Sequence, residues 1–312
     1  MSANKQPNPE RDIFMSTEHT SQTIPVDWKS FWTPFAEDLC IHDLLYQQAE
    51  QRPDAIAIHS PDGDWTYTSL IERVNFLASR LRTLGVQPGT LVGIAVERTP
   101  DMVAALYAIL EAGGAYVPVD PYYPPERVAI MLEDADVQCL ITQSHLLTQL
   151  PTLQSEVFLL DKEITSPTDR DLNAPRATPQ DLAYAMYTSG STGRPKCAQI
   201  QHQGIVNLIE AMQDAPGFSC EDTGVGVISL SHDMSVADIF VTLSSGARLV
   251  IAPRESAKDG VQLATLLNDV KATYISATPS IFRMLLDVDW HPIVPIKCLA
   301  AGEALPADII PP

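Results

Sequence analysis

Short apolar segments and amphipathic segments alternate along most of this chain. Residues 91–96 have the apolar composition of a buried strand, Thr99-Pro100-Asp101 has the features of a helix start, and residues 115–119 form the next apolar segment. Proline suits the first turn of a helix because its φ is fixed and its missing N–H is not needed there. Strands separated by helices of this length pair in parallel through right-handed crossovers. The chain is therefore predicted to be an α/β protein with parallel sheets flanked by helices in βαβ units.

The same patterns extend the prediction to both sides of this region. An apolar face along residues 41–49 predicts a helix, and Ser69 and Glu72 have the spacing of a capping box for a helix that ends near Gly85. His202 precedes another amphipathic helix, where a histidine is typical of a surface or capping position. Further strands are predicted at 55–58, 137–142, 157–160, 182–186, 225–230, 248–251, 273–276 and 297–301, and further helices at 125–134, 236–243 and 279–286.

The charge balance excludes some classes of partner. The chain has 312 residues with 39 acidic and 20 basic side chains, a formal net charge of -19. Such an excess of negative charge argues against nucleic acid or an anionic membrane surface as a partner. No apolar run approaches the ~20 residues of a membrane span, and the polar N-terminus lacks a signal-peptide core. We therefore expect a cytoplasmic protein.

Two further features concern organisation and redox state. Residues 1–38 are polar and show no helical or strand periodicity, so they are predicted to be a leader or linker before a domain at 39–312. The five cysteines form no C-x-x-C pair and have no histidine at a spacing typical of zinc sites. They are predicted to be reduced and structural, with no metal site.

A run of small hydroxyl residues and glycines, closed by a lysine, follows the predicted strand at 182–186. Glycine lets a ligand approach the main chain, and hydroxyl groups, backbone N–H groups and a lysine charge suit a polyphosphate. A cluster of Ser, Thr and Gly is also typical of an ordinary loop. The P-loop motif is excluded because Arg-Pro separates the last glycine from the lysine. The residues of the run are Thr188, Ser189, Gly190, Ser191, Thr192, Gly193 and Lys196.

The segment from Tyr187 to Lys196 resembles the phosphate loop of the adenylate-forming enzymes, and specifically of the amino-acid-activating adenylation domains of nonribosomal peptide synthetases. Residues 65–70 and 109–121 are similar to two other stretches of that family. Both segments are interpreted as parts of the helix and strand packing, so they support the fold and not the chemistry. The resemblance implies the large N-terminal subdomain of such an enzyme. It also implies ATP as a substrate, with the loop as its phosphate site and Lys196 as a catalytic residue.

A second match lies at residues 232–236, which resemble the Phe-Asp-x-Ser-Val stretch of the family. By themselves Asp233 and Ser235 are typical of helix N-caps. In the family the matching aspartate binds the α-ammonium group of the substrate. A carboxylate in a partly dry site prefers a cation and penalises a substrate that lacks one, so Asp233 favours an amino acid over an aryl or fatty acid. His232 replaces the usual phenylalanine of the family.

The resemblance implies further site residues. The expected substrate pocket combines small and apolar side chains, which favours an amino acid with a neutral, largely apolar side chain. Cys197 replaces the usual glycine after the lysine. Either the charge of Lys196 lowers the pKa of its thiol and makes it reactive, or Cys197 is a tolerated small residue without a chemical role. The expected substrate-binding residues are His232, Asp233, Met234, Ala237, Ser276, Leu299 and Ala301, and the residues along the adenine ring are Gly302, Glu303 and Ala304.

The chain ends soon after this last segment. The family's glutamate that is linked to Mg²⁺ and the small C-terminal subdomain are expected beyond Pro312, so we expect a truncated adenylation domain whose parent system includes a carrier protein with a phosphopantetheine arm. Two alternatives stay open. One is a non-catalytic nucleotide-binding fragment. The other is an acyl- or aryl-CoA ligase, which would need no ammonium-binding acid.

Overall fold

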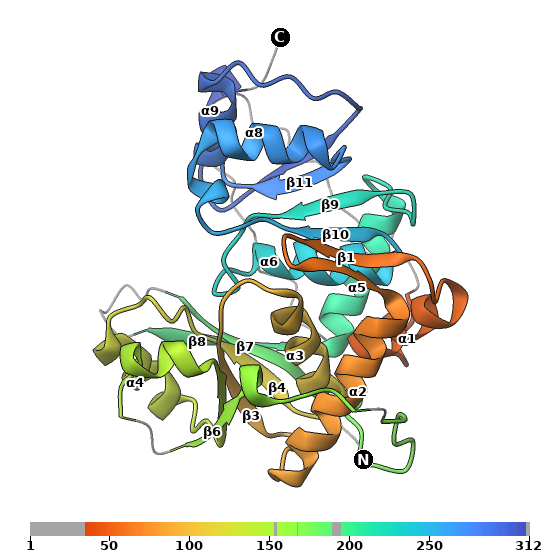
Figure 1. Ribbon diagram of the computed structural model, residues 1–312, viewed down its shortest axis with the longest axis vertical. Coiled ribbons are helices and arrows are strands. Elements are labelled where there is room, and N and C mark those ends of the chain that lie inside the picture. The colour runs from red at the N-terminus through yellow and green to blue at the C-terminus, as the bar shows by residue number, and fades with distance from the viewer. Residues whose placement is uncertain (1–34, 153–154, 167, 189–194, 310–312) are drawn as a thin grey trace, which may run out of the picture. The chain divides into compact units, whose positions relative to one another are not determined.

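Two six-stranded sheets organise the residues that the computed structural model describes, which are 35–152, 155–166, 168–188 and 195–309 (Figure 1). Both sheets belong to a unit that begins at Phe35. In order across the sheet, sheet A contains β12 (Lys297–Ala300), β11 (Tyr274–Ala277), β9 (Thr223–Gly226), β10 (Arg248–Ile251), β1 (Ile56–Ser60) and β2 (Gly63–Thr66). Sheet B contains β6 (Glu156–Leu159), β5 (Cys139–Thr142), β3 (Leu91–Ala95), β4 (Ala115–Pro118), β7 (Leu182–Thr188) and β8 (Lys196–Gln201).

The strands are parallel within each sheet except at one edge. In sheet A, β2 pairs antiparallel with β1, and in sheet B, β8 pairs antiparallel with β7. All other neighbouring strands pair in parallel. The prediction of an α/β fold with parallel strand pairing is thus confirmed for the interior of both sheets. The two antiparallel edge strands make the sheets mixed, and neither strand was predicted.

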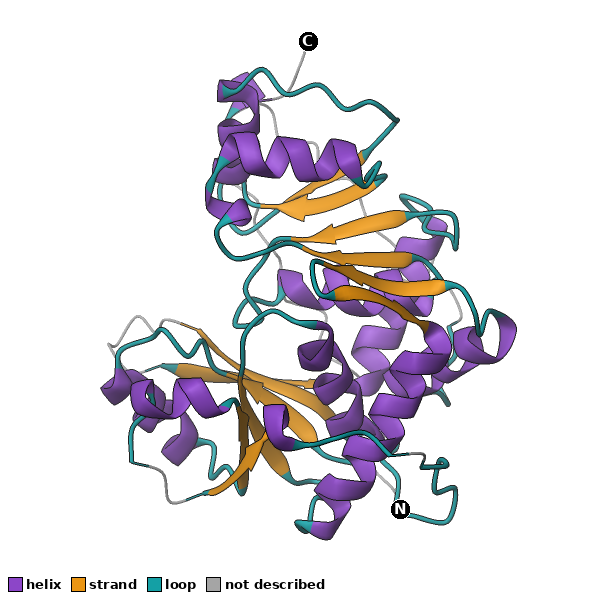
Figure 2. Cartoon of the chain, in the orientation of Figure 1, coloured by secondary structure: helices purple, strands orange, loops and turns teal. Residues whose placement is uncertain are grey.

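Helices cover both faces of the sheets, as the separation of purple and orange in Figure 2 shows. The α-helices are α1 (Ile41–Gln51), α2 (Tyr67–Thr83), α3 (Pro100–Glu111), α4 (Pro125–Asp134), α5 (His202–Asp214), α6 (Met234–Val236), α7 (Thr242–Ser244), α8 (Gly260–Asp269) and α9 (Pro279–Asp287). A π-helical turn, η4 (Ala237–Val241), joins α6 to α7. Short 3₁₀ turns are η2 (Ser144–Gln149), η3 (Leu160–Lys162), η5 (Ser256–Lys258) and η6 (Ala307–Ile309).

Three apolar cores lie between the sheets and the helices that cover them. The largest core includes buried residues of both sheets together with α1, α2, α3, α5 and the segment from α6 to α7. Phe240 is fully buried there and contacts Tyr107 of α3 edge to face, at 5.2 Å between ring centroids. A second core joins sheet B to α4, and a third joins sheet A to α8 and α9. The central helices are therefore buried between the two sheets, which explains why every residue from Met102 to Glu111 of α3 is buried.

The helix starts test the capping predictions. Thr99 caps α3 by accepting a hydrogen bond from the Met102 amide, and Pro100 occupies the first turn, as predicted. The predicted capping box at Ser69 and Glu72 is wrong. The helix begins at Tyr67, and the side chain of Thr66 accepts the capping hydrogen bond from the Ser69 amide. Trp65 and Thr66 end strand β2, and α2 follows at once, so the helix begins earlier than the capping pattern indicated.

The prediction for His202 is also wrong. Its ring is fully buried, although it is the first residue of α5, and its Nδ1 accepts a hydrogen bond of 3.4 Å from the Ile41 amide. The start of α1 packs over it, which a sequence pattern along α5 alone does not reveal. Near the same helix, the Ala36 amide donates to the carboxylate of Glu210. The predicted leader up to residue 38 falls mostly outside the described residues, and its boundary stays a prediction.

Two buried polar groups connect distant elements. The Tyr67 hydroxyl, which is fully buried, lies 3.0 Å from the Leu243 carbonyl and 2.8 Å from the Ala247 carbonyl. The Asp222 carboxylate accepts hydrogen bonds from Lys297 and Thr273, which join the start of β9 to β11 and β12. Burial raises the pKa of Asp222, but these hydrogen bonds and one from the Ser219 amide outweigh burial and hold its pKa below the ordinary 3.8.

Candidate functional site

A cavity of about 370 Å³ lies at the carboxyl ends of the strands of sheet A. Ligands of open α/β sheets commonly bind at this edge. The register of β9, β11 and β12 aligns these ends, with Gly226 opposite Ser276 and Ala277 opposite Ala300. The cavity is lined by Arg98, Asp120, Val227, Ile228, Ser229, His232, Asp233, Met234, Arg254, Ala257, Lys258, Thr278, Ile281, Gly302 and Glu303.

Gly302 brings the loop after β12 close to the loop after β9. Its φ is +84°, in the left-handed region that favours glycine. A Cβ atom at this position would lie 3.3 Å from the sulfur of Met234. The backbone at Gly302 can therefore form one wall of the cavity directly against Met234.

Sheet B contributes charged residues to the same cavity. Arg98, which follows β3, donates to the Val227 carbonyl at 2.6 Å and to the Ala252 carbonyl at 3.4 Å. Asp120, which follows β4, forms an ion pair of 3.2 Å with Arg254. Burial lowers the pKa of Arg98, while the nearby carboxylate of Asp238 acts in the opposite direction. These contacts join loops of the two sheets around the cavity.

Asp233 is exposed, and this corrects the reasoning that placed it in a partly dry site. It occupies the N-cap position of α6 without a side-chain capping hydrogen bond. Its role as a helix cap is therefore not supported, and its carboxylate is not used by the helix. Burial raises the pKa of Tyr184 to about 12, with a smaller contribution from the negative charge of Asp233.

The structure brings together only some of the expected substrate residues. His232, Asp233 and Met234 line the cavity with Gly302 and Glu303. The other four expected substrate residues are not among the residues that line it. Ala237 and Ser276 are buried, Leu299 is exposed on β12 and Ala301 is half-buried after that strand.

Ser276 and Glu303 differ in their hydrogen bonding. The Ser276 hydroxyl is buried and has no hydrogen-bond partner among the described residues. The Glu303 carboxylate accepts hydrogen bonds from the amide and the hydroxyl of Ser280, at 3.3 and 2.6 Å. Ser280 lies in the first turn of α9, where the helix dipole favours a negative charge. Ala304 is exposed.

The strands on either side of the predicted phosphate loop, β7 and β8, pair antiparallel. Thr188, the last residue of β7, is paired with Lys196, the first residue of β8, and both are exposed. The loop residues Ser189, Gly190, Ser191, Thr192 and Gly193 lie outside the described residues. Burial raises the pKa of the Cys197 thiol, which does not fit an acidified, reactive cysteine.

Sequence reasoning missed the charged lining from sheet B and from the loop after β10. Arg98 and Arg254 stand in segments whose sequence shows no recognisable site pattern. Asp120 lies within residues 109–121, which were interpreted as packing segments alone. An aspartate at the end of an apolar strand was the available signal, because the residues that follow parallel strands often contact ligands.

The fold is that of an α/β protein with a cavity at the carboxyl ends of parallel strands. A family model described as AMP-binding enzyme matches residues 45–310. This chain belongs to that family of AMP-binding enzymes.

Curated relatives match nearly the whole chain. Tyrocidine synthase 3 from Brevibacillus parabrevis is 38% identical in an alignment of 308 positions that covers 96% of this chain and 5% of that protein. Gramicidin S synthase 2 from Brevibacillus brevis is 36% identical over 302 residues, or 96% of this chain and 7% of that protein. The chain therefore spans only a small fraction of the length of these relatives.

Solved structures with the same fold include peptide synthetases. A four-domain nonribosomal peptide synthetase bound to AMP and glycine superposes with a TM-score of 0.82 at 28% identity, over 89% of this chain and 20% of that one. The N-terminal subdomain of NpsA from Klebsiella oxytoca gives a TM-score of 0.79 at 26% identity, over 88% of this chain and 70% of that one. The described part of the chain thus has the fold of such a subdomain. Its helices include none that is both long and apolar enough to cross a membrane.

Proposed function

We propose that this chain is part of an enzyme that activates an amino acid for nonribosomal peptide synthesis. The observation that carries the proposal is the cavity at the carboxyl ends of sheet A, where the carboxylate of Asp233 lies with Gly302 and Glu303. Relatives named as gramicidin and tyrocidine synthases support the same class of reaction. In this reaction a carboxylate oxygen of the amino acid attacks the α-phosphorus of ATP. Pyrophosphate leaves, and an aminoacyl-adenylate remains.

Each group has a role in the proposal. Asp233 binds the α-ammonium group of the amino acid, and its lack of a capping hydrogen bond leaves its oxygens available for this contact. Met234, which lines the cavity, contacts the side chain of the substrate and favours a neutral, largely apolar amino acid. Lys196 and the hydroxyl and glycine residues from Thr188 to Gly193 bind the phosphates. A lysine there offsets negative charge that grows on the α-phosphate in the transition state.

Gly302, Glu303 and Ala304 are assigned to the adenine ring. A similar solved synthetase in its AMPPNP-bound form, with a TM-score of 0.80 and 30% identity over 89% of this chain, supports ATP as the nucleotide. Mg²⁺ would arrive with ATP and neutralise phosphate charge. The carboxylates of Asp120 and Glu303 are held by Arg254 and Ser280. We therefore assign neither of them to the metal ion.

A carrier protein with a phosphopantetheine arm is the proposed acceptor of the activated amino acid in the parent system. The names of the relatives support this partner, because peptide synthases are the proteins that this chain resembles over 96% of its length. A cytoplasmic location and the absence of a nucleic-acid partner stay predictions from the net charge of -19.

Amino-acid-dependent exchange of pyrophosphate into ATP tests the proposal. The purified chain is assayed with a panel of amino acids and their des-amino analogues, beside Lys196→Ala and the matched variant Lys258→Ala, whose lysine lines the cavity outside the phosphate loop. We expect exchange with one apolar amino acid, a large loss in Lys196→Ala and a smaller change in Lys258→Ala. Exchange with des-amino acids would favour an acyl- or aryl-CoA ligase. ATP binding that depends on Lys196 without any exchange would indicate a nucleotide-binding fragment.

A further inference from the structure

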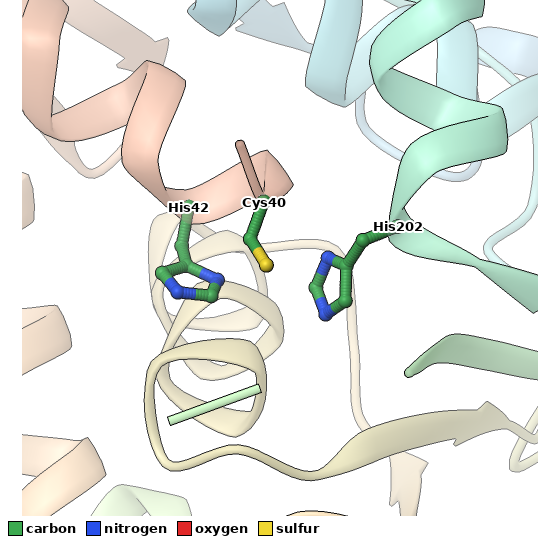
Figure 3. Close-up of side chains that lie close together, drawn as sticks. All are labelled: Cys40, His42 and His202. Carbon is green, nitrogen blue, oxygen red and sulfur yellow. The ribbon is translucent and has the colours of Figure 1, made fainter. Parts of the chain in front are cut away.

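Three potential metal ligands meet between α1 and α5, outside the cavity described above (Figure 3). Cys40 precedes α1, His42 lies in its first turn, and His202 is the first residue of α5. Their exposed fractions are 2%, 1% and 0%. One ligand atom from each residue lies within 4.8 Å of the other two. In Figure 3 the thiol of Cys40 lies between the two imidazole rings.

The polar contacts of His42 leave one of its ring nitrogens without a partner. Its Nε2 faces the carboxylate of the buried residue Glu111 at 3.9 Å. Its Nδ1 is buried and has no hydrogen-bond partner among the described residues. An imidazole that directs one N–H toward a carboxylate presents the lone pair of its other nitrogen, and metal-binding histidines commonly have such a carboxylate behind them.

A metal ion would replace two contacts of this cluster, and the one between the Ile41 amide and His202 is long. The Cys40 thiol donates to the Ala177 carbonyl at 3.4 Å, and the Ile41 amide donates to Nδ1 of His202 at 3.4 Å. The second nitrogen of His202, Nε2, has no partner among the described residues. In the absence of metal the cluster therefore leaves two buried imidazole nitrogens unsatisfied, which is unfavourable. Ligation through either nitrogen of His202 would use a group that is now weakly bonded or unbonded.

We propose that Cys40, His42 and His202 form a structural site for a thiophilic transition-metal ion, either Zn²⁺ or Cu⁺. A thiolate and imidazoles favour these ions, whereas Mg²⁺ and Ca²⁺ require oxygen ligands. Typical metal–sulfur and metal–nitrogen distances of about 2.3 and 2.0 Å place tetrahedral ligand atoms about 3.3–3.5 Å apart, so the side chains must close by at most about 1.5 Å. Binding displaces the thiol proton to solvent, so the thiolate offsets one positive charge of the metal.

The site would fasten two elements that are distant in sequence. It links the start of α1 to the start of α5, and α5 follows β8 without an intervening loop. Since β8 begins at Lys196, the metal would hold the helix at the far end of the strand that carries this lysine. The metal would stabilise the folded chain, whether or not the chain takes part in the proposed reaction.

Metal analysis of the intact chain tests the proposal. The protein is purified from medium with added Zn²⁺ or Cu⁺, passed over a desalting column and analysed for metal per chain. The decisive variant is Cys40→Ala, and Cys139→Ala is its matched control because that cysteine is also buried, with 2% exposed. We expect about one metal ion per chain in the wild type and in Cys139→Ala, and a loss of this metal in Cys40→Ala.

Spectroscopy of the wild type keeps the proposal testable if Cys40→Ala does not fold. Added Co²⁺ should give the near-ultraviolet thiolate band and visible bands of a Cys- and His-bound ion, and one equivalent of Zn²⁺ should remove them. Binding to the folded state alone raises Tm, here by at least about 5 °C at saturating Zn²⁺ or Cu⁺. Wild-type protein that retains no metal, gives no cobalt bands and has the same Tm with chelator and with metal would overturn the proposal.

Discussion

Replacing Asp233 by asparagine should separate substrate recognition from stability. The side chain is exposed and makes no capping hydrogen bond. We therefore expect the free energy of unfolding to change by less than about 0.5 kcal/mol. A hydrogen bond between charged groups contributes about 1.5–3 kcal/mol. Because water reaches Asp233, the lower limit applies, and affinity for the amino acid should fall roughly tenfold.

A two-by-two comparison measures this contribution directly. The wild type and Asp233→Asn are each titrated calorimetrically with the amino acid and with its des-amino analogue, in the presence of an ATP analogue. The expected coupling is about 1.5 kcal/mol, because the variant has no carboxylate left for the ammonium group to contact. Asp289→Asn, whose side chain is 94% exposed and outside the cavity, is the matched control. If Asp233→Asn weakens both ligands by the same factor, Asp233 does not recognise the ammonium group.

Three other variants test the fold around the site. Tyr67→Phe removes the hydroxyl that lies 2.8 Å from the buried Ala247 carbonyl and should lower the free energy of unfolding by about 1–3 kcal/mol; an unchanged urea midpoint would contradict a stabilising hydrogen bond there. Gly302→Ala places a side chain at a φ of +84° and should cost about 1–2 kcal/mol in the same assay, whereas a gain in stability would mean that this backbone is not left-handed. Asp222→Asn removes a carboxyl whose pKa is lowered on folding, so it removes stability that is present above pH ~4 and is lost as pH falls through the folded-state pKa. Urea unfolding from pH 7 to pH 3 should show a weaker pH dependence in this variant than in the wild type, and parallel curves would contradict the lowered pKa.

The interior of the sheets could be predicted from the sequence because each buried strand is an apolar run. The strand predicted at 248–251 has the bounds of β10, and the helix predicted at 125–134 has those of α4. β8 was missed because its residues are mostly exposed and polar, as expected for an edge strand that packs on one side only. The burial of His202 was missed for a related reason. It depends on α1, which is about 160 residues away in the sequence.

The candidate site could be predicted only in part. Asp233 and Met234 were found through a family motif, and both line the cavity. Arg98, Asp120 and Arg254 were not found, because each follows a different strand and only the meeting of the two sheets brings them together. Asp120 and Arg254 are more than 130 residues apart, so no local sequence motif contains both of them.

The position of the cavity has a consequence for how such proteins change over time. Several of its lining residues, including Asp233, Gly302 and Glu303, follow strands of sheet A, whereas the register of the sheet is set by the strands before them. A substitution at Met234 changes the shape and polarity offered to a ligand without altering strand pairing. Copies of this fold can therefore come to differ in the cavity one substitution at a time, each on a scaffold that still folds.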